Sequence, residues 1–154
     1  MERSSRNYSI RFESRRTFFE GFAHKNFVGG RFAAHLRRFQ IFGGSALQSA
    51  GNAAKYAPPK TIIEISARKS DNETVEFAVT DEGTGVAEDL REKIFDKFFR
   101  LTDLSNGEYA PSGTGLGLAI AKGIIEAHGG KIFVTDGANK TGAKFIFTIP
   151  IGDE

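Results

Sequence analysis

Three glycines at alternate positions, directly before an apolar run, constrain this chain more than any other feature. The stretch reads Gly113-Thr114-Gly115-Leu116-Gly117-Leu118-Ala119-Ile120. Glycine has no Cβ atom, so its backbone can adopt positive φ and lie close to a bulky anion. A helix that begins at Leu116 would point N–H groups and the positive end of its dipole at that anion. The stretch therefore predicts a phosphate-binding turn, although glycines before a helix also occur in purely structural turns.

Two familiar phosphate loops do not fit this stretch. A dinucleotide fingerprint needs G-x-G-x-x-G after a strand, but position 118 is Leu and the preceding residues are polar and turn-forming. A Walker A loop needs G-x-x-x-x-G-K-[ST], which the sequence lacks. A bound nucleotide must therefore be held by another architecture.

Length and composition fit one globular domain. A chain of 154 residues with 40% hydrophobic and 26% charged residues can bury a real core. The absence of cysteine excludes disulfides, thiolate metal sites and a cysteine nucleophile. No apolar run approaches the length of a membrane span, and the Arg-rich N-terminus does not have the pattern of a signal peptide.

The charge distribution divides the chain into two parts. Residues 1–45 carry nine Lys or Arg against three Asp or Glu, a balance of +6, and eight of the fifteen Phe. Residues 46–154 carry twelve against sixteen, a balance of −4. Arg and Phe together could contact nucleic acid or anionic lipid. A charge run alone is weak evidence, so we interpret 1–45 as a basic, aromatic extension that is disordered or not native to the domain.

Hydrophobic periodicity predicts the elements of the domain 46–154. The pattern favours a short helix within the extension over 30–40, and in the domain helices over 46–56, 88–95 and 116–128 and strands over 61–69, 74–80, 131–135 and 144–150. The polar stretch 101–112 has no period and is expected to be a mobile loop placed where a lid would lie. Together these elements predict an α/β (α+β) two-layer sandwich, with helices on one face of a mixed, largely antiparallel sheet.

Two further stretches carry candidate ligand contacts. Gln48, Asn52, Lys55 and Tyr56 fall on one face of the first domain helix, which is either a solvated face or a row of groups aimed at a ligand. Asp81-Glu82-Gly83-Thr84-Gly85 follows a strand directly, so an acid and two glycines meet in one turn. An Asp in a turn more often simply caps it.

Taken in order, these stretches resemble the motifs of sensor histidine kinases. Residues 52–56 resemble the N box, 81–85 the first glycine box, 94–100 the F box and 113–118 the second glycine box, and 126–132 resemble the segment after that box. The resemblance covers roughly 46–150 and identifies the histidine-kinase catalytic and ATP-binding domain. The run Asn-Ala-Ala-Lys-Tyr-Ala-Pro-Pro is most similar to the potassium-responsive Kdp-type sensors.

The resemblance implies a Bergerat-type ATP-binding fold and a role for each matching residue. It makes Asn52 and Lys55 catalytic: Asn52 supplies an oxygen to Mg²⁺, and Lys55 offers a charge to the phosphates. Asp81 accepts the adenine amino hydrogen, and Gly83 and Gly85 let the base approach. The remaining nucleotide-binding residues that it implies are Gln48, Tyr56, Phe95, Phe98, Arg100, Gly113, Thr114, Gly115, Leu116, Gly117 and Leu118.

The activity implied is transfer of the γ-phosphate of ATP to a histidine on a separate domain or chain. The implied partners are a histidine-phosphotransfer and dimerisation domain and a response regulator, with no nucleic acid. A cytoplasmic location follows from the resemblance, with a membrane reached only through sensor regions that this sequence lacks. The alternatives are a Bergerat-fold ATPase or anti-sigma Ser kinase, and a nucleotide-binding regulatory module without transfer activity.

Three departures from the family pattern keep those alternatives open. The N box usually begins Asn-Leu-Leu, whereas this chain has Gln48-Ser49-Ala50. Neither His24 nor His35 is followed by the acidic residue and proline of a phosphoacceptor box. Residues 1–45 also lack the dimerisation helices expected there, so we expect a truncated or frame-shifted reading upstream of about Gly51.

Overall fold

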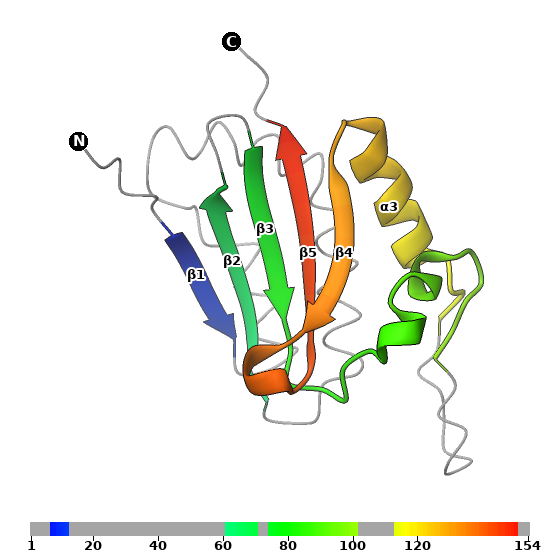
Figure 1. Cartoon of the computed structure of the whole chain (residues 1–154), viewed down its shortest axis with the longest axis horizontal. Helices are drawn as coiled ribbons and strands as arrows, with labels where there is room; N and C mark the ends of the chain where they lie inside the picture. The colour runs from blue at the N-terminus through cyan, green and yellow to red at the C-terminus, as the bar shows by residue number, and fades with distance from the viewer. Residues whose placement is uncertain (1–6, 13–60, 71–73, 102–112, 151–154) are drawn as a thin grey trace.

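An antiparallel sheet of five strands organises the protein. The computed structural model describes residues 7–12, 61–70, 74–101 and 113–150. The strands are β1 (Asn7–Phe12), β2 (Ile63–Lys69), β3 (Thr74–Thr80), β4 (Lys131–Asp136) and β5 (Ala143–Pro150). Their order across the sheet is β1-β2-β3-β5-β4, and every described pairing is antiparallel (Figure 1). The predicted largely antiparallel sheet is confirmed.

Side chains alternate between the two faces of the sheet along each strand, and the buried apolar ones form its core face. In the β2–β3 hairpin, Ala67 pairs with Phe77, and Phe77 pairs in turn with Phe147 of β5. Phe77 and Phe147 are both buried, and their rings stack with centroids 5.4 Å apart. The other strand residues of the same cluster are Val75, Ile132, Val134, Ala143, Phe145 and Ile149.

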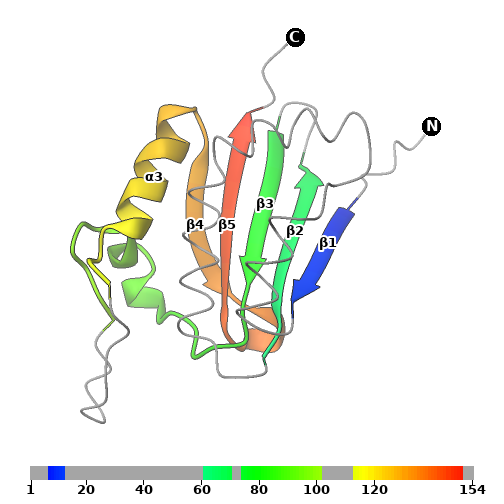
Figure 2. The same cartoon turned by 180° about the vertical axis from the view of Figure 1, so that it is seen from behind.

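Helix α3 (Gly117–Ala127) covers this core face beside β4 (Figures 1 and 2). Ala121 and Ile125 face inward and are 1% and 0% exposed, whereas Ile120 on the same helix is 57% exposed. Apolar residues at a spacing of four produce such a one-sided helix. The helix predicted over 116–128 is therefore confirmed, with each end shorter by one residue.

The segment predicted as a helix over 88–95 is instead two short 3-10 turns. These are η1 (Glu88–Leu90) and η2 (Lys93–Phe95), and a third turn, η3 (Ala138–Lys140), lies between β4 and β5. The N–H groups of Leu90 and Phe95 donate to the carbonyls three residues earlier, at 2.9 and 3.2 Å. A segment of two turns gains too few α-helical bonds to offset nucleation, so packing of Ile94 and Phe95 in the core determines its shape.

Strand β1 lies in the basic extension and was not predicted. It pairs with β2 in a register that sets Ile10 opposite Ile65. The predicted helices over 30–40 and 46–56 and most of the predicted loop 101–112 lie outside the described residues. Within the part of the chain that the structure describes, no helix is long and apolar enough to cross a membrane.

Candidate functional site

The carboxylate of Asp81 is the most deeply buried charged group among the described residues. Asp81 directly follows β3 and is 2% exposed. Its Oδ1 atom accepts hydrogen bonds from the N–H of Gly83 at 2.8 Å and from the N–H of Ala143 at 3.1 Å. Both described bonds go to Oδ1, so no described donor bonds Oδ2. A buried carboxylate with one oxygen left over is suited to accept a hydrogen bond from a ligand.

Burial also changes the acidity of this group. The pKa of the Asp81 carboxyl is raised above its ordinary value because burial disfavours the charged form, and the hydrogen bonds from Gly83 and Ala143 offset part of that rise. Perturbed acids of this kind gather at functional sites.

The loop after Asp81 packs tightly against the turn between β4 and β5. Gly85 has φ +76, and a Cβ atom on it would lie 2.8 Å from the carbonyl oxygen of Gly142. A Cβ atom on Gly142 would lie 1.8 Å from the carbonyl oxygen of Asp81. Glycine is required at both positions, since another residue would force the loop and the turn apart.

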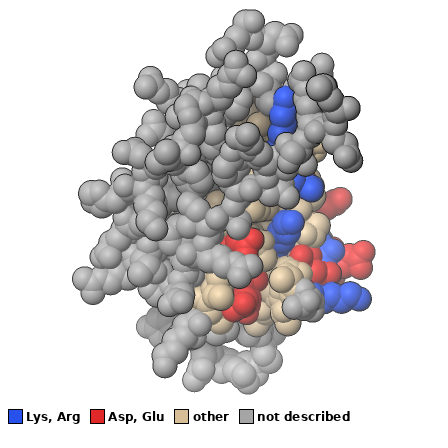
Figure 3. Space-filling view, turned by 90° about the vertical axis from the view of Figure 1, so that its left-hand side faces the viewer, with Lys and Arg blue, Asp and Glu red and all other residues tan. Residues whose placement is uncertain are grey.

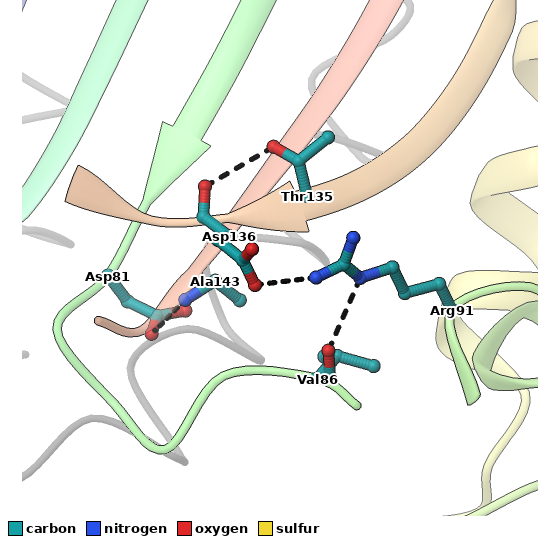
Figure 4. A network of polar contacts seen from close by, with 6 residues as sticks. All are labelled: Asp81, Val86, Arg91, Thr135, Asp136 and Ala143. Carbon is teal, nitrogen blue, oxygen red and sulfur yellow. Dashed lines mark hydrogen bonds and ion pairs between the residues drawn. The ribbon is translucent and has the colours of Figure 1, made fainter. Parts of the chain in front are cut away.

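Arg91 joins the same loop to the end of β4 (Figure 4). Its Nη2 atom donates to Oδ1 of Asp136 at 2.5 Å, and its Nε atom donates to the carbonyl oxygen of Val86 at 3.3 Å. The loop 81–86 is thus attached to the β4–β5 hairpin at both of its ends.

The F box and the second glycine box meet directly. The N–H of Phe98 donates to the carbonyl oxygen of Gly115 at 2.9 Å. A Cβ atom on Gly115, which has φ +71, would lie 2.7 Å from the carbonyl carbon of Phe98. η1 and η2 connect the Asp81 loop, which follows the end of β3, to this junction at the start of α3 (Figures 1 and 2).

Two of the F-box aromatic residues, Phe95 and Phe98, differ in their packing. Phe95 is 7% exposed and packs in the core, with the Lys122 ammonium 5.9 Å from the centre of its ring. Phe98 is 71% exposed and has φ +67, so its side chain points away from the core. Phe95 and Ile94, not Phe98, anchor this segment, and Arg100 is exposed.

The start of α3 offers main-chain donors. Leu116 is the N-cap residue, and no side chain caps the helix. The first intrahelical bond of this turn runs from the N–H of Ile120 to the carbonyl of Leu116 at 2.9 Å. The N–H groups of Gly117, Leu118 and Ala119 precede it and have no intrahelical acceptor. Gly113 and Thr114 are exposed just before them, so the arrangement fits an anionic group.

Four predicted site residues, Gln48, Asn52, Lys55 and Tyr56, lie outside the described residues. The expected Mg²⁺ ligand is among them. Over the described ranges, no group of three or more His, Asp or Glu gathers in a way that could hold a metal ion.

Sequence reasoning missed the contribution of the β4–β5 turn. The strands predicted over 131–135 and 144–150 leave the residues between them as a mere connection, whereas Gly142, Ala143 and Asp136 all contact the Asp81 loop or its Arg91 anchor. The two glycines of that turn, Gly137 and Gly142, were the available signal, since paired glycines often mark a close backbone approach. Their spacing alone does not indicate which segment approaches them.

Comparison with known proteins identifies the family of the chain. Residues 47–153 match the family model described as "Histidine kinase-, DNA gyrase B-, and HSP90-like ATPase". The chain therefore belongs to this family, whose domains bind ATP.

Within the family, the chain groups with sensor histidine kinases. It is 46% identical over 101 residues to the sensor protein KdpD of Clostridium acetobutylicum, a match that covers 64% of this chain and 11% of that protein. It resembles the solved structure of the mycobacterial sensor histidine kinase MprB with a TM-score of 0.61 and 32% identity, covering 70% of this chain and 68% of that one. It resembles full-length ShkA in complex with AMPPNP with a TM-score of 0.55 and 34% identity, covering 70% of this chain and 20% of that one. The chain spans 11 to 26% of the first curated relatives that it matches.

Proposed function

We propose that residues 46–154 are the ATP-binding catalytic domain of a sensor histidine kinase, which transfers the γ-phosphate of ATP to a histidine on a separate domain or chain. The observation that carries the proposal is the buried Asp81 carboxylate, bonded through Oδ1 and with no described donor at Oδ2. The likeness to ShkA, solved in complex with AMPPNP, supports a nucleotide in this fold.

The Asp81 site fits adenine and disfavours guanine. Oδ2 would accept a hydrogen bond from the exocyclic amino group of adenine. Guanine presents a carbonyl oxygen at the equivalent position, so two acceptors would face each other and lose the bond. Gly83 and Gly85 carry no side chain that could keep the base from the loop.

The start of α3 fits the phosphates. N–H groups of Gly117 and Leu118, together with the positive end of the helix dipole, would face the negative charge of the triphosphate. Positioning and charge neutralisation are the main contributions that a protein makes to phosphoryl transfer. In the transfer, an imidazole nitrogen would form a bond to the γ-phosphorus as the bridging P–O bond breaks, and ADP would leave with the electron pair.

The remaining parts of the proposal rest on the sequence resemblance. Asn52 would hold Mg²⁺, which neutralises phosphate charge when it is bound, and Lys55 would contact the phosphates. The partners would be a histidine-bearing dimerisation domain and a response regulator, and the domain would act in the cytoplasm.

A labelling experiment tests this function. The full chain is incubated with Mg²⁺ and ATP labelled at the γ-phosphate, with and without a dimerisation domain from a related sensor kinase. We expect acid-labile label on the added domain and none on this chain, because none of its three histidines, His24, His35 and His128, is followed by the acidic residue of a phosphoacceptor box. Label on a histidine of this chain would contradict the proposal, and ADP release without any label on the added domain would favour an ATPase.

A further inference from the structure

We propose that the turn between β4 and β5 positions Asp81 for base recognition, and that Gly142 is the positioning residue on which adenine selectivity depends. The turn comprises residues 137–142 and is followed by Ala143, the first residue of β5. This inference rests on the proposed function, because it concerns the same nucleotide site. It assigns a role to a segment some sixty residues away from Asp81 in the sequence.

The first observation is the close approach of Gly142 to the Asp81 backbone. Gly142 is buried and has φ +70. A Cβ atom there would lie 1.8 Å from the carbonyl oxygen of Asp81, 2.6 Å from its carbonyl carbon and 2.9 Å from the Cα atom of Glu82. These are backbone atoms, so any side chain at position 142 must displace the Asp81–Glu82 peptide itself.

The second observation is that the next residue holds both the backbone and the side chain of Asp81. The N–H of Asp81 donates to the carbonyl oxygen of Ala143 at 2.9 Å, and the N–H of Ala143 donates to Oδ1 at 3.1 Å. The Ala143 peptide therefore determines which carboxylate oxygen is occupied and which is left for a ligand. A shift between residue 142 and Asp81 would disturb both bonds together.

The third observation is that the turn is closed by a hydrogen bond and linked to the far end of the loop. The N–H of Gly137 donates to the carbonyl oxygen of Gly142 at 3.0 Å, which closes the turn. Asp136, immediately before it, binds Arg91, which also donates to the carbonyl oxygen of Val86 (Figure 4). The hairpin end thus fixes the loop 81–86 at its start and at its end.

Displacing Asp81 should change selectivity and not merely stability. A variant that only unfolds part of the population lowers the apparent affinity for every nucleotide by the same factor. A variant that moves the carboxylate weakens ATP, which needs the Asp81 bond, more than GTP, which does not. The ratio of ATP to GTP affinity therefore separates a positioning role from a structural one.

The experiment compares Gly142→Ala with a matched glycine variant in the full chain. Gly129→Ala is the control, because Gly129 also has positive φ (+75) but, among the described residues, a Cβ atom there would meet only Pro150 Cγ at 3.5 Å. Competition of ATP and of GTP against a fluorescent ATP analogue gives the two affinities. We expect the ATP-to-GTP ratio to fall at least about ten-fold in Gly142→Ala and to stay at the wild-type value in Gly129→Ala.

A folded Gly142→Ala variant with the wild-type ratio would overturn the inference. If that variant fails to fold, the ATP-to-GTP ratio is measured in Asp136→Asn and Arg91→Gln instead. Both side chains lie partly in solvent, so we expect these variants to fold. A ratio lowered about two-fold or more in both supports the inference, and a wild-type ratio in both overturns it. A wild-type chain that binds ATP no better than GTP would instead overturn the proposed function, before any variant is measured.

Discussion

Asp81 shows how a single residue can be unfavourable for stability and still be suited to binding. Its carboxylate is taken out of water, which raises its pKa, and two backbone N–H groups bond one oxygen. A ligand that donates a hydrogen bond to the second oxygen would offset part of the free energy that burial of the carboxylate costs. Binding sites commonly hold such locally unfavourable groups.

Replacing Asp81 with Asn should separate stability from binding. The amide oxygen can accept the same bonds from Gly83 and Ala143 without a buried charge, so the free domain should unfold at a higher denaturant concentration than wild type. The amide NH₂ would face the adenine amino group, so two donors would face each other and form no hydrogen bond. We expect a loss of about 1.5–3 kcal/mol in ATP binding, roughly ten- to a hundred-fold, measured by calorimetry. Unchanged affinity would remove Asp81 from base recognition.

The raised pKa of Asp81 also makes a prediction about pH. In the folded chain this carboxyl holds its proton to a higher pH than in the unfolded chain, so folded protein binds more protons between the two pKa values. Its contribution to stability is therefore present in full at acid pH and is lost as pH rises through the raised pKa. Denaturant unfolding from about pH 4 to pH 8 should show the stability of wild type falling relative to Asp81→Asn. A constant difference across this range would contradict the raised pKa.

At the scale of elements, α3 connects the core to the candidate phosphate end of the site. Its inner face carries Ala121 and Ile125 against the sheet, and its first turn presents N–H groups beside Gly115. Packing of this helix therefore fixes where those donors lie. The junction of Phe98 with Gly115 attaches the F box to the same end.

Two isoleucines on α3 test this packing. Ile125→Ala should lower the free energy of unfolding by about 2–5 kcal/mol, because the side chain is fully buried and a cavity would remain. Ile120→Ala is the matched control on the same helix, 57% exposed, and should change stability by no more than about 0.5 kcal/mol. Equal effects in urea unfolding would mean that the helix does not face the sheet in this way.

Many of the helices and strands could be predicted because they follow local periodicity in the sequence. Alternation in β2, β3 and β5 and the four-residue spacing in α3 identify these elements from the sequence. Strand β1 was missed although Tyr8, Ile10 and Phe12 alternate, because its partner β2 lies some fifty residues away. Isolated short strands carry little signal of their own.

The candidate site could be predicted only in part, for a related reason. Asp81 and Gly115 stand in recognisable motifs, whereas the roles of Gly142 and Arg91 depend on contacts between distant segments. The 3-10 turns η1 and η2 replaced the predicted helix because core packing of Phe95 outweighs weak local propensity.

At the scale of the whole molecule, positive and negative charges are mixed on the face that Figure 3 shows. In Figure 3, Lys and Arg lie interspersed with Asp and Glu among the described residues on that face. Arg68 and Glu76 pair through two hydrogen bonds of 2.8 and 2.9 Å. A nucleic-acid interface instead gathers positive charge on one face. This part of the surface therefore gives no support to such a partner.

The central claim is that one end of the sheet holds ATP between a buried acid and a glycine-rich helix start. Calorimetric titration of the full chain with non-hydrolysable ATP and GTP analogues, each with and without Mg²⁺, tests it most directly. We predict binding of the ATP analogue that strengthens with Mg²⁺, and binding of the GTP analogue that is at least about ten-fold weaker. Absence of binding by the ATP analogue, or equal affinity for the two analogues, would contradict the account.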